Sequence, residues 1–245
     1  MEIQGDVALI TGSARRIGRA IALELAGSGC DIAIHYNASA TDAEQTAEAV
    51  RQLGRRAVTL AAPLTDAGAT AALPNQTVTA LGRLDILINN ASAFVPMNLA
   101  DFSLSEWNHT LAVNLTGPMI LAHAAYPHLK ARRRGRIVNL LDICVDRPWP
   151  EYLAYCASKA GLSTLTQALA KAMAPDVRVN GVAPGAAMFP EDYDQEKIKA
   201  ITRHIPGLRA GSAEDVAAAV HFLVAGCDYI TGAILAVDGG RNIAW

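Results

Sequence analysis

Tyr155 and Lys159 lie four positions apart, a spacing that places two side chains on the same face of a helix. A nearby ammonium favours the phenolate form, so the spacing predicts a lowered pKa for Tyr155 and a role for its hydroxyl in proton transfer. Asp142 lies thirteen residues upstream of the tyrosine. A carboxyl group beside the phenol would form an acid pair, which is more than most carbonyl reductions require.

These residues must be positioned by a scaffold in which short apolar segments alternate with longer helical ones. We expect seven strands, at Val7–Thr11, Asp31–His35, Ala57–Ala61, Leu84–Asn89, Arg136–Leu141, Arg178–Ala183 and Ala233–Val237. Helices are expected at Arg16–Ser28, Thr41–Leu53, Ala67–Leu81, Ser105–Ala131, Tyr152–Met173 and Ala213–Val224. Several strands are apolar throughout, which is typical of strands with both faces covered. The pattern predicts one α/β domain over residues 1–245, with a doubly wound, seven-stranded parallel sheet and helices on both faces.

One segment, Ala186–Lys199, interrupts this alternation. It follows Pro184-Gly185 and combines Pro190 with charged residues. We expect an irregular segment with a short helix, forming a substrate lid over a cleft at about residues 186–210.

The first expected strand is followed by a glycine-containing turn and a helix. Gly12 and Gly18 bracket this turn, with Arg15, Arg16 and Ile17 inside it. A strand, a tight turn and a helix N-terminus together offer backbone N–H groups and a dipole to a phosphate. Arg16 takes the place of the middle glycine, so the fingerprint is imperfect, but its position at the first strand–helix junction predicts a Rossmann fold that binds a dinucleotide.

The end of the second strand indicates which dinucleotide is bound. It carries no acidic side chain: His35, Tyr36, Asn37, Ala38, Ser39. NAD enzymes usually place an acid there for the ribose 2′-hydroxyl, whereas two arginines in the turn suit a 2′-phosphate. NADP(H) is therefore preferred. The alternative, that Arg15 and Arg16 are only exposed helix-start residues, is disfavoured because the dipole repels cations at that end.

Composition excludes other classes. Of the 245 residues, 51% are hydrophobic, enough for a sizeable core, and the net charge of −2 gives no general attraction to nucleic acid or an anionic membrane. A local basic run is expected to be a solvated helix end rather than a binding patch: Lys130, Arg132, Arg133, Arg134, Arg136.

The four cysteines show no C-x-x-C pair and the six histidines show no ligand spacing, so we expect free thiols and no metal site. Neither a signal peptide nor a transmembrane segment is evident, and a cytoplasmic protein is the default expectation.

Several motifs occur in order along the chain: Thr11-Gly12 with Gly18, Asn89-Asn90-Ala91, Asn114, Tyr155-x-x-x-Lys159, Pro184-Gly185 and Val237-Asp238-Gly239-Gly240. Together they resemble the short-chain dehydrogenases/reductases. Four departures from that family's usual pattern are similar to the pteridine reductases, which reduce pterins or folates with NADPH: Arg16, His35-Tyr36, the segment Asn90 to Phe94, and Asp142 in place of serine. The bacterial dihydromonapterin reductases belong to the same group.

The resemblance implies a set of cofactor contacts: Gly12, Arg15, Arg16, Ile17, Gly18, His35, Tyr36, Asn37, Ser39, Leu64, Asn89, Ala91, Tyr155, Lys159, Pro184 and Gly185. Two positions depart from it. Pro63 stands where an acidic residue often contacts the adenine, which leaves the backbone of Leu64 for that contact. Ala38 stands where some pteridine reductases carry an arginine, so binding of the 2′-phosphate would depend more on Arg15, Arg16 and Ser39.

The resemblance also implies catalytic roles. Tyr155 delivers a proton, Lys159 binds the nicotinamide ribose, and Asn114 holds a water at a helix irregularity, which Gly117-Pro118 favours. Asp142, held partly protonated, would supply a proton through Tyr155 to a ring nitrogen. The alternative for Asp142 is a structural acid paired with a neighbour such as Arg147.

The implied substrate contacts are Arg16, Ser92, Phe94, Asp142 and Tyr155. Phe94 would stack on a flat heterocycle and gain on the order of 1 kcal/mol, unless it is a core or lid residue. The resemblance implies a homotetramer in which the two long helices pair, and Tyr152–Met173 is accordingly too apolar for a helix with one wet face. The terminal Trp245 is expected to dock on a neighbouring subunit.

The sequence thus predicts an NADPH-dependent reductase of a pterin or folate. Two alternatives stay open: a carbonyl reductase of the same fold acting on ketones or 3-oxoacyl thioesters, and a non-catalytic NADP-binding sensor. The presence of both Tyr155 and Lys159 speaks against the sensor.

Overall fold

A seven-stranded parallel sheet in the order β3-β2-β1-β4-β5-β6-β7 forms the centre of the computed structural model, which describes residues 2–131, 133–189 and 193–244. Its strands are β1 Val7–Ile10, β2 Asp31–Tyr36, β3 Ala57–Ala61, β4 Ile86–Asn89, β5 Gly135–Leu140, β6 Val177–Pro184 and β7 Ile234–Val237. All neighbouring strands pair in parallel. The predicted fold class is confirmed.

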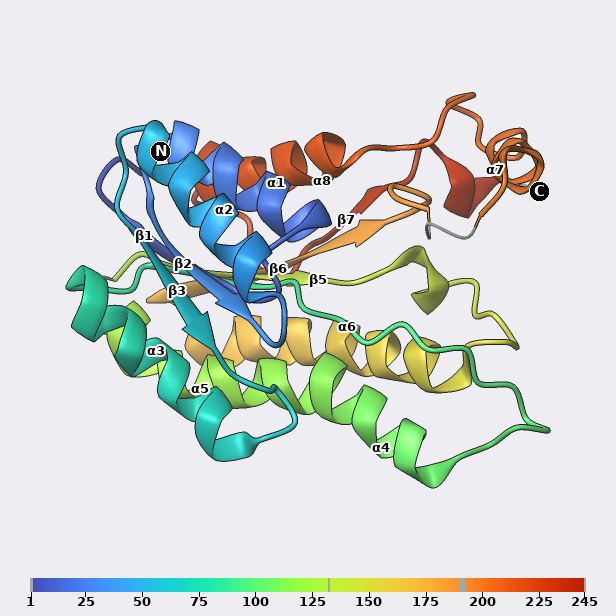
Figure 1. Cartoon of the computed structure of the whole chain (residues 1–245), viewed down its shortest axis with the longest axis horizontal. Coiled ribbons are helices and arrows are strands. Elements are labelled where there is room, and N and C mark those ends of the chain that lie inside the picture. The colour runs from blue at the N-terminus through green and yellow to red at the C-terminus, as the bar shows by residue number, and fades with distance from the viewer. Residues whose placement is uncertain (1, 132, 190–192, 245) are drawn as a thin grey trace.

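Helices cover both faces of this sheet, with α1, α2 and α8 on one side and α3, α5 and α6 on the other (Figure 1). The helices are α1 Arg16–Gly27, α2 Ala40–Gln52, α3 Ala67–Leu81, α4 Leu104–Leu111, α5 Gly117–Ala131, α6 Leu153–Met173, α7 Gln195–Thr202 and α8 Ala213–His221. In β1, Ala8 and Ile10 pack into the first core, whereas Val7 and Leu9 pack into the second. This alternation explains why the strand is apolar at every position.

The order of the strands in the sheet changes direction between β1 and β4. Strands β2 and β3 continue from β1 on one side, and β4 to β7 continue on the other. In an open parallel sheet, such a switch point leaves a crevice at the carboxyl ends of the strands. Among the helices of the described residues, none is long and apolar enough to span a bilayer.

The predicted elements agree with the observed ones except where two long helices change geometry. The helix expected over Ser105–Ala131 is divided by a π-helical turn, η1 Ala112–Thr116, into α4 and α5. Pro118 follows that turn and lacks the backbone N–H that a regular α-helix would use. The helix expected to run to Val224 ends at His221 and continues as a second π-helical turn, η3 Phe222–Gly226.

The irregular segment before α8 contains the expected short helix. This is α7, whose N-terminus is capped by Asp194, because its carboxylate accepts the N–H of Lys197 at 2.7 Å. Pro190, which belongs to the predicted lid, and Trp245, expected to dock on another subunit, lie outside the described residues.

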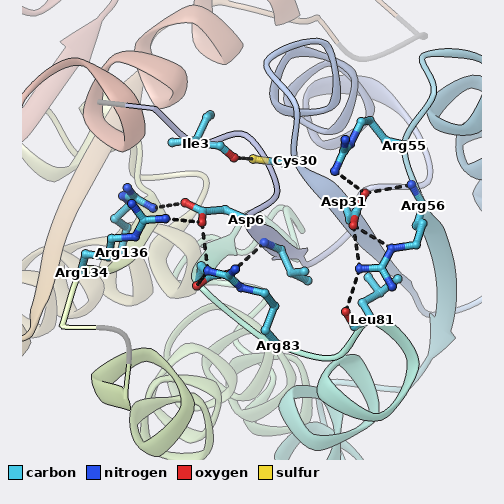
Figure 2. A network of polar contacts seen from close by, with 12 residues as sticks. Ile3, Asp6, Cys30, Asp31, Arg55, Arg56, Leu81, Arg83, Arg134 and Arg136 are labelled. Carbon is cyan, nitrogen blue, oxygen red and sulfur yellow. Dashed lines mark hydrogen bonds and ion pairs between the residues drawn. The ribbon is translucent and has the colours of Figure 1, made fainter.

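At the end of the sheet opposite the crevice, buried aspartates form ion pairs and hydrogen bonds with several arginines (Figure 2). Asp6 is fully buried and accepts hydrogen bonds from Arg83 at 3.1 Å, Arg134 at 2.9 Å and Arg136 at 2.7 Å. The prediction of a solvated basic helix end is therefore wrong for Arg136, which is buried, whereas Arg134 pairs with Asp6 and is still exposed. A buried carboxylate must be paired, and these guanidinium groups provide the pairing. The predicted free thiols are confirmed for all four cysteines.

Candidate active site

A cleft of about 780 Å³ opens at the carboxyl ends of the strands. Its volume lies in the range of small-molecule and cofactor sites. Most of the predicted site residues line it: Gly12, Arg15, Arg16, Ile17, Gly18, His35, Asn37, Leu64, Ala91, Ser92, Phe94, Asp142, Tyr155, Lys159, Pro184 and Gly185. Tyr36, Ser39, Asn89 and Asn114 are not among the residues that line it.

The centre of the cleft is a hydrogen-bonded acid pair. The Tyr155 hydroxyl donates to Oδ2 of Asp142 at 2.9 Å. Oδ1 of the same carboxylate accepts the backbone N–H of Cys144 at 2.8 Å, in the turn that follows β5. The sequence prediction that the carboxyl group and the phenol meet is confirmed. Asp142 is thus engaged by Tyr155 and Cys144, so pairing with Arg147 does not explain its position.

Lys159 is held one helical turn from Tyr155 on α6, as predicted. Its ammonium nitrogen donates to the backbone carbonyl of Leu140 at 2.7 Å and lies 5.6 Å from the centre of the Tyr155 ring. Both side chains are buried. This carbonyl belongs to Leu140, the last residue of β5. The end of the strand that leads to Asp142 therefore also positions the lysine.

Burial governs the protonation of this group. It raises the pKa of Tyr155 well above its usual value, and the nearby Asp142 raises it further. The predicted lowering by Lys159 is therefore wrong in this structure. Burial likewise raises the pKa of Asp142, although hydrogen bonds from Cys144 and Tyr155 oppose that shift. Burial lowers the pKa of Lys159 to about 8, so every one of the three groups shifts towards its neutral form.

Asn114 lies in the π-helical turn η1 and holds the loop that follows β4. Its side-chain oxygen accepts the N–H of Ala93 at 2.7 Å, and its nitrogen donates to the carbonyl of Ala93 at 2.9 Å. The same nitrogen donates to Ser158 at 3.0 Å, and the Ser92 hydroxyl donates to the oxygen at 3.3 Å. The predicted helix irregularity is confirmed, and the side chain fixes the segment that carries Phe94. The water-holding role of Asn114 stays a prediction.

Phe94 projects into the cleft with 42% of its surface exposed, so it is not a core residue. Its ring stacks on Tyr152 at a centroid distance of 4.4 Å and an interplanar angle of 10°. It also forms a T-shaped pair with the ring of Tyr155, with a centroid distance of 4.7 Å and an interplanar angle of 82°. Trp149 lies parallel to Tyr155 at 6.4 Å. The cleft therefore has an aromatic wall next to the acid pair.

The phosphate turn after β1 packs closely on itself and on the segment after β4 at its two glycines. Gly12 has a φ of +63°, and a Cβ there would lie 3.0 Å from the backbone of Ala91. A Cβ on Gly18 would lie 2.3 Å from the carbonyl oxygen of Gly12. Arg16, in the place of the middle glycine, has a φ of +56°, a left-handed conformation that is strained for a side chain of this size. Backbone N–H groups at the start of α1 and two arginines fit a phosphorylated dinucleotide.

His35 supports this turn from beneath. It is 1% exposed, and its Nδ1 accepts the backbone N–H of Gly12 at 3.1 Å. Its Nε2 lies 2.9 Å from the carbonyl of Ala62, which fixes that nitrogen as the donor. The side chain thus joins the carboxyl ends of β1, β2 and β3, and burial lowers its pKa, which keeps the ring neutral.

The predicted residues that do not line the cleft have other positions. Tyr36 ends β2 and packs against the core, and Ser39 is the residue before α2. Asn89 is buried, and its amide nitrogen donates to Asn139 on β5 at 2.8 Å. Its side-chain oxygen has no hydrogen-bond partner among the described residues, so the predicted cofactor contact of Asn89 stays a prediction.

Sequence reasoning missed several residues that line the cleft, among them His109, Trp149 and Arg241, whereas Phe189, Tyr193 and Ile201 fall inside the predicted lid segment. Trp149 lies six residues before Tyr155, and Arg241 directly follows a Gly-Gly pair. Neither position carries a periodic pattern that would bring it to the cleft, so only the fold reveals them.

Comparison with known proteins identifies the family. Residues 12–242 match the family model described as Enoyl-(Acyl carrier protein) reductase. The chain is 33% identical over 249 residues to 3beta-hydroxysteroid dehydrogenase 1 of Eggerthella lenta, covering 99% of this chain and 95% of that one. It is 33% identical over 243 residues to a 3-oxoacyl-(acyl-carrier-protein) reductase of Synechocystis, covering 97% of each. The structure of acetoin dehydrogenase from Salmonella typhimurium superimposes with a TM-score of 0.90 at 33% identity, covering 98% of this chain and 97% of that one.

The fold and the Tyr155–Lys159 site define a nicotinamide-dependent oxidoreductase. The chain belongs to the short-chain dehydrogenase/reductase family. The resemblance inferred from the motifs is confirmed at this level.

The strained Arg16 gives a first test. Replacing it with glycine removes the left-handed strain, so we expect Arg16→Gly to be at least as stable as the wild type and up to ~1 kcal/mol more stable. If Arg16 contacts a cofactor phosphate, the same variant binds NADPH at least tenfold more weakly. Urea unfolding and fluorescence titration measure the two effects. A destabilised variant with unchanged NADPH affinity would contradict this account.

The buried lysine gives a second test. Because the pKa of Lys159 falls from 10.5 to about 8 on folding, the unfolded chain holds this proton more tightly between those values. Stability contributed by this group therefore rises as the pH increases from about 8 towards 10.5, by about 3 kcal/mol in total. We expect this rise to be missing in Lys159→Met. The measurement is urea unfolding of both proteins at a series of pH values from about 8 to 10.5. Taking the difference between the two proteins removes the contribution of groups that titrate in both. Curves of stability against pH that run parallel would refute the buried-lysine account.

Proposed function

We propose that this protein reduces a ring C=N bond of a pterin or folate, with NADPH as the reductant. The observation that carries the proposal is the 2.9 Å hydrogen bond between the Tyr155 hydroxyl and the Asp142 carboxylate. Reduction of C=N requires hydride at carbon and a proton at nitrogen. A second acid beside the tyrosine serves that proton, whereas a carbonyl oxygen needs only the tyrosine and a hydrogen-bond donor.

The electrostatics of the pair support this division of work. A tyrosine whose pKa is raised well above its usual value is costly to leave as a phenolate. Asp142, whose pKa is also raised by burial, holds a proton more readily than an exposed aspartate. As Tyr155 gives its proton to the ring nitrogen, a proton held on Asp142 would pass to the phenol oxygen, so no phenolate would accumulate. NADPH, when bound, supplies the hydride to the adjacent carbon.

The cofactor would be held by the phosphate turn and the strand ends. Gly12 and Gly18 permit the tight turn that aims backbone N–H groups at a pyrophosphate, and Arg15 and Arg16 offer positive charge to a 2′-phosphate. Lys159, anchored on the carbonyl of Leu140, would bind the ribose hydroxyls. The absence of an acid in the segment 35–39 supports NADP(H) over NAD.

The aromatic wall suits a flat substrate. Phe94 is fixed through Ala93 by Asn114 and is partly exposed in the cleft, and a heterocycle would stack on the part of its ring that Tyr152 and Tyr155 leave uncovered. Ser92 and Arg16 line the same cleft and provide polar contacts for the edge of such a ring.

A second candidate is reduction of a ketone or a 3-oxoacyl thioester. The names of the relatives favour it, since they include 3-oxoacyl-(acyl-carrier-protein) reductases from Synechocystis and Staphylococcus aureus. Asp142 and the exposed Phe94 favour the heterocycle instead. A cofactor-binding protein without catalysis is a third reading, against which the complete Tyr155–Lys159 site speaks.

A panel of four substrates separates these readings. NADPH oxidation is followed with dihydrobiopterin, dihydrofolate, a diketone and an acetoacetyl thioester. We expect turnover of a pterin or folate. Brisk ketone or thioester reduction without pterin turnover would establish the second candidate, and silence on all four would favour the third.

Asp142 is then tested by substitution. We expect Asp142→Asn, which keeps the shape of the side chain but loses its acid, to lower kcat for dihydropterin by about 100-fold or more. Asp142→Ser should show the same loss while restoring the family's usual residue for carbonyl reduction. NADPH affinity, measured by fluorescence titration, should be unchanged in both variants. An equal loss of affinity and kcat would point to a structural role for the carboxylate.

A further inference from the structure

A guanidinium lies in the cleft away from the phosphate turn. Arg241, in the short 3-10 turn η4 Arg241–Ile243, lines the same cleft as Tyr155 and is half-buried. The same cleft is also lined by residues from the lid region: Met188, Phe189, Tyr193 and Ile201. No side chain of the described residues forms a hydrogen bond or ion pair with the Arg241 guanidinium, whereas Arg83, Arg134, Arg136 and Arg209 all have carboxylate partners.

The turn that carries Arg241 is fixed in position. The Asp238 carboxylate accepts the backbone N–H of Gly240 at 2.9 Å and that of Asn242 at 2.6 Å. Gly240 has a φ of +87°, which glycine adopts without strain. The backbone N–H of Gly207, beyond the lid helix α7, donates to the carbonyl of Gly239 at 2.8 Å. The C-terminal end of the chain accordingly lies beside α7 (Figure 1).

A further contact ties this turn to the acid pair. The side-chain nitrogen of Asn242 donates to Oδ2 of Asp146 at 2.7 Å. Asp146 closes the short turn that begins at Asp142, because its N–H donates to the carbonyl of Ile143 at 3.1 Å. Arg241 is therefore held relative to the reacting end of the cleft through two consecutive, hydrogen-bonded turns.

The cleft carries positive charge at two separate places, the phosphate turn and Arg241, and each place suits an anion. Among the described residues that line it, Asp142 is the only acid, and its oxygens are engaged by Tyr155 and Cys144. Arg15 and Arg16 stand at the phosphate turn and belong to the cofactor. Arg241 has no such assignment, and a planar guanidinium on a fixed turn suits bidentate binding of a carboxylate.

We propose that Arg241 binds a carboxylate on the tail of the substrate, so that the enzyme prefers a pterin bearing an acidic side arm, of the folate type, to an unconjugated pterin. This inference rests on the proposed function. The stacked ring would lie against Phe94 next to Tyr155, and the arm would run past the apolar lid residues to the guanidinium. The rigid turn lets the arginine bind without paying to order its backbone.

The test compares two substrates that share the reacting ring. Dihydrofolate carries carboxylates on its arm, whereas dihydrobiopterin carries none. We expect Arg241→Gln to raise KM for dihydrofolate by about 10- to 100-fold, the range for losing a hydrogen bond to a charged group. KM for dihydrobiopterin and the affinity for NADPH should change by less than about twofold. Arg241→Lys, which keeps the charge but not the fork, should fall between the wild type and Arg241→Gln.

Arg203→Gln is the matched control, because Arg203 is an exposed arginine near the end of α7 that does not line the cleft. It removes the same charge and should leave both KM values unchanged. An Arg241→Gln variant that affects the two substrates equally, or affects neither, overturns the inference while leaving pterin reduction intact. A wild-type enzyme that reduces dihydrobiopterin but not dihydrofolate also overturns it. Failure of the wild type to reduce either substrate rejects both the proposed function and this inference.

Discussion

One hydrogen bond, from the Tyr155 hydroxyl to the Asp142 carboxylate at 2.9 Å, determines what chemistry this site is suited to. It joins two acids in a buried place where both lose the stabilisation that water gives to their charged forms. Burial raises the pKa of both groups, and Lys159 is shifted towards neutrality as well. These shifts favour the protonated forms of both acids, and the proposed addition of a proton to a ring nitrogen rests on that shared tendency.

The sheet makes this hydrogen bond possible. The turn after β5 carries Asp142. The helix α6 follows that turn and carries Tyr155 and Lys159 among its buried residues. The last carbonyl of β5 holds the lysine, and the following turn holds the aspartate through Cys144. At the other end of the strands, buried ion pairs around Asp6 stabilise the scaffold and take no part in the cleft (Figure 2).

Much of this arrangement was predictable from the sequence because it depends on local patterns. Strand and helix periodicity predicts the elements, and their alternation predicts a parallel sheet whose carboxyl ends collect the motif residues. The meeting of Tyr155 and Asp142 follows from one helix and the strand end before it. The pKa of Tyr155 was not predictable, because burial outweighs the charge of Lys159 and burial is a property of the whole fold.

Other features depend on contacts between distant segments, which no local pattern encodes. The burial of the Arg136 side chain depends on its hydrogen bond to Asp6, which lies 130 positions away in the sequence. The amide of Asn89 is engaged by Asn139 across the sheet, and Arg241 reaches the cleft only because the C-terminal turn is bound to Gly207 and Asp146. At Arg16, the absence of the usual glycine is visible in the sequence. The left-handed backbone, which makes an arginine at this position strained, appears only in the structure.

The central claim is that hydride and proton add across a ring C=N bond. It is tested most directly with a 7,8-dihydropterin that also carries a ketone on its side chain, reduced with NADPH deuterated at the transferable position. The two reducible bonds then compete within one molecule in one cleft. The account predicts deuterium on the ring carbon next to the newly protonated nitrogen. Deuterium on the side-chain carbinol carbon, with the ring unreduced, would contradict it and establish a carbonyl reductase.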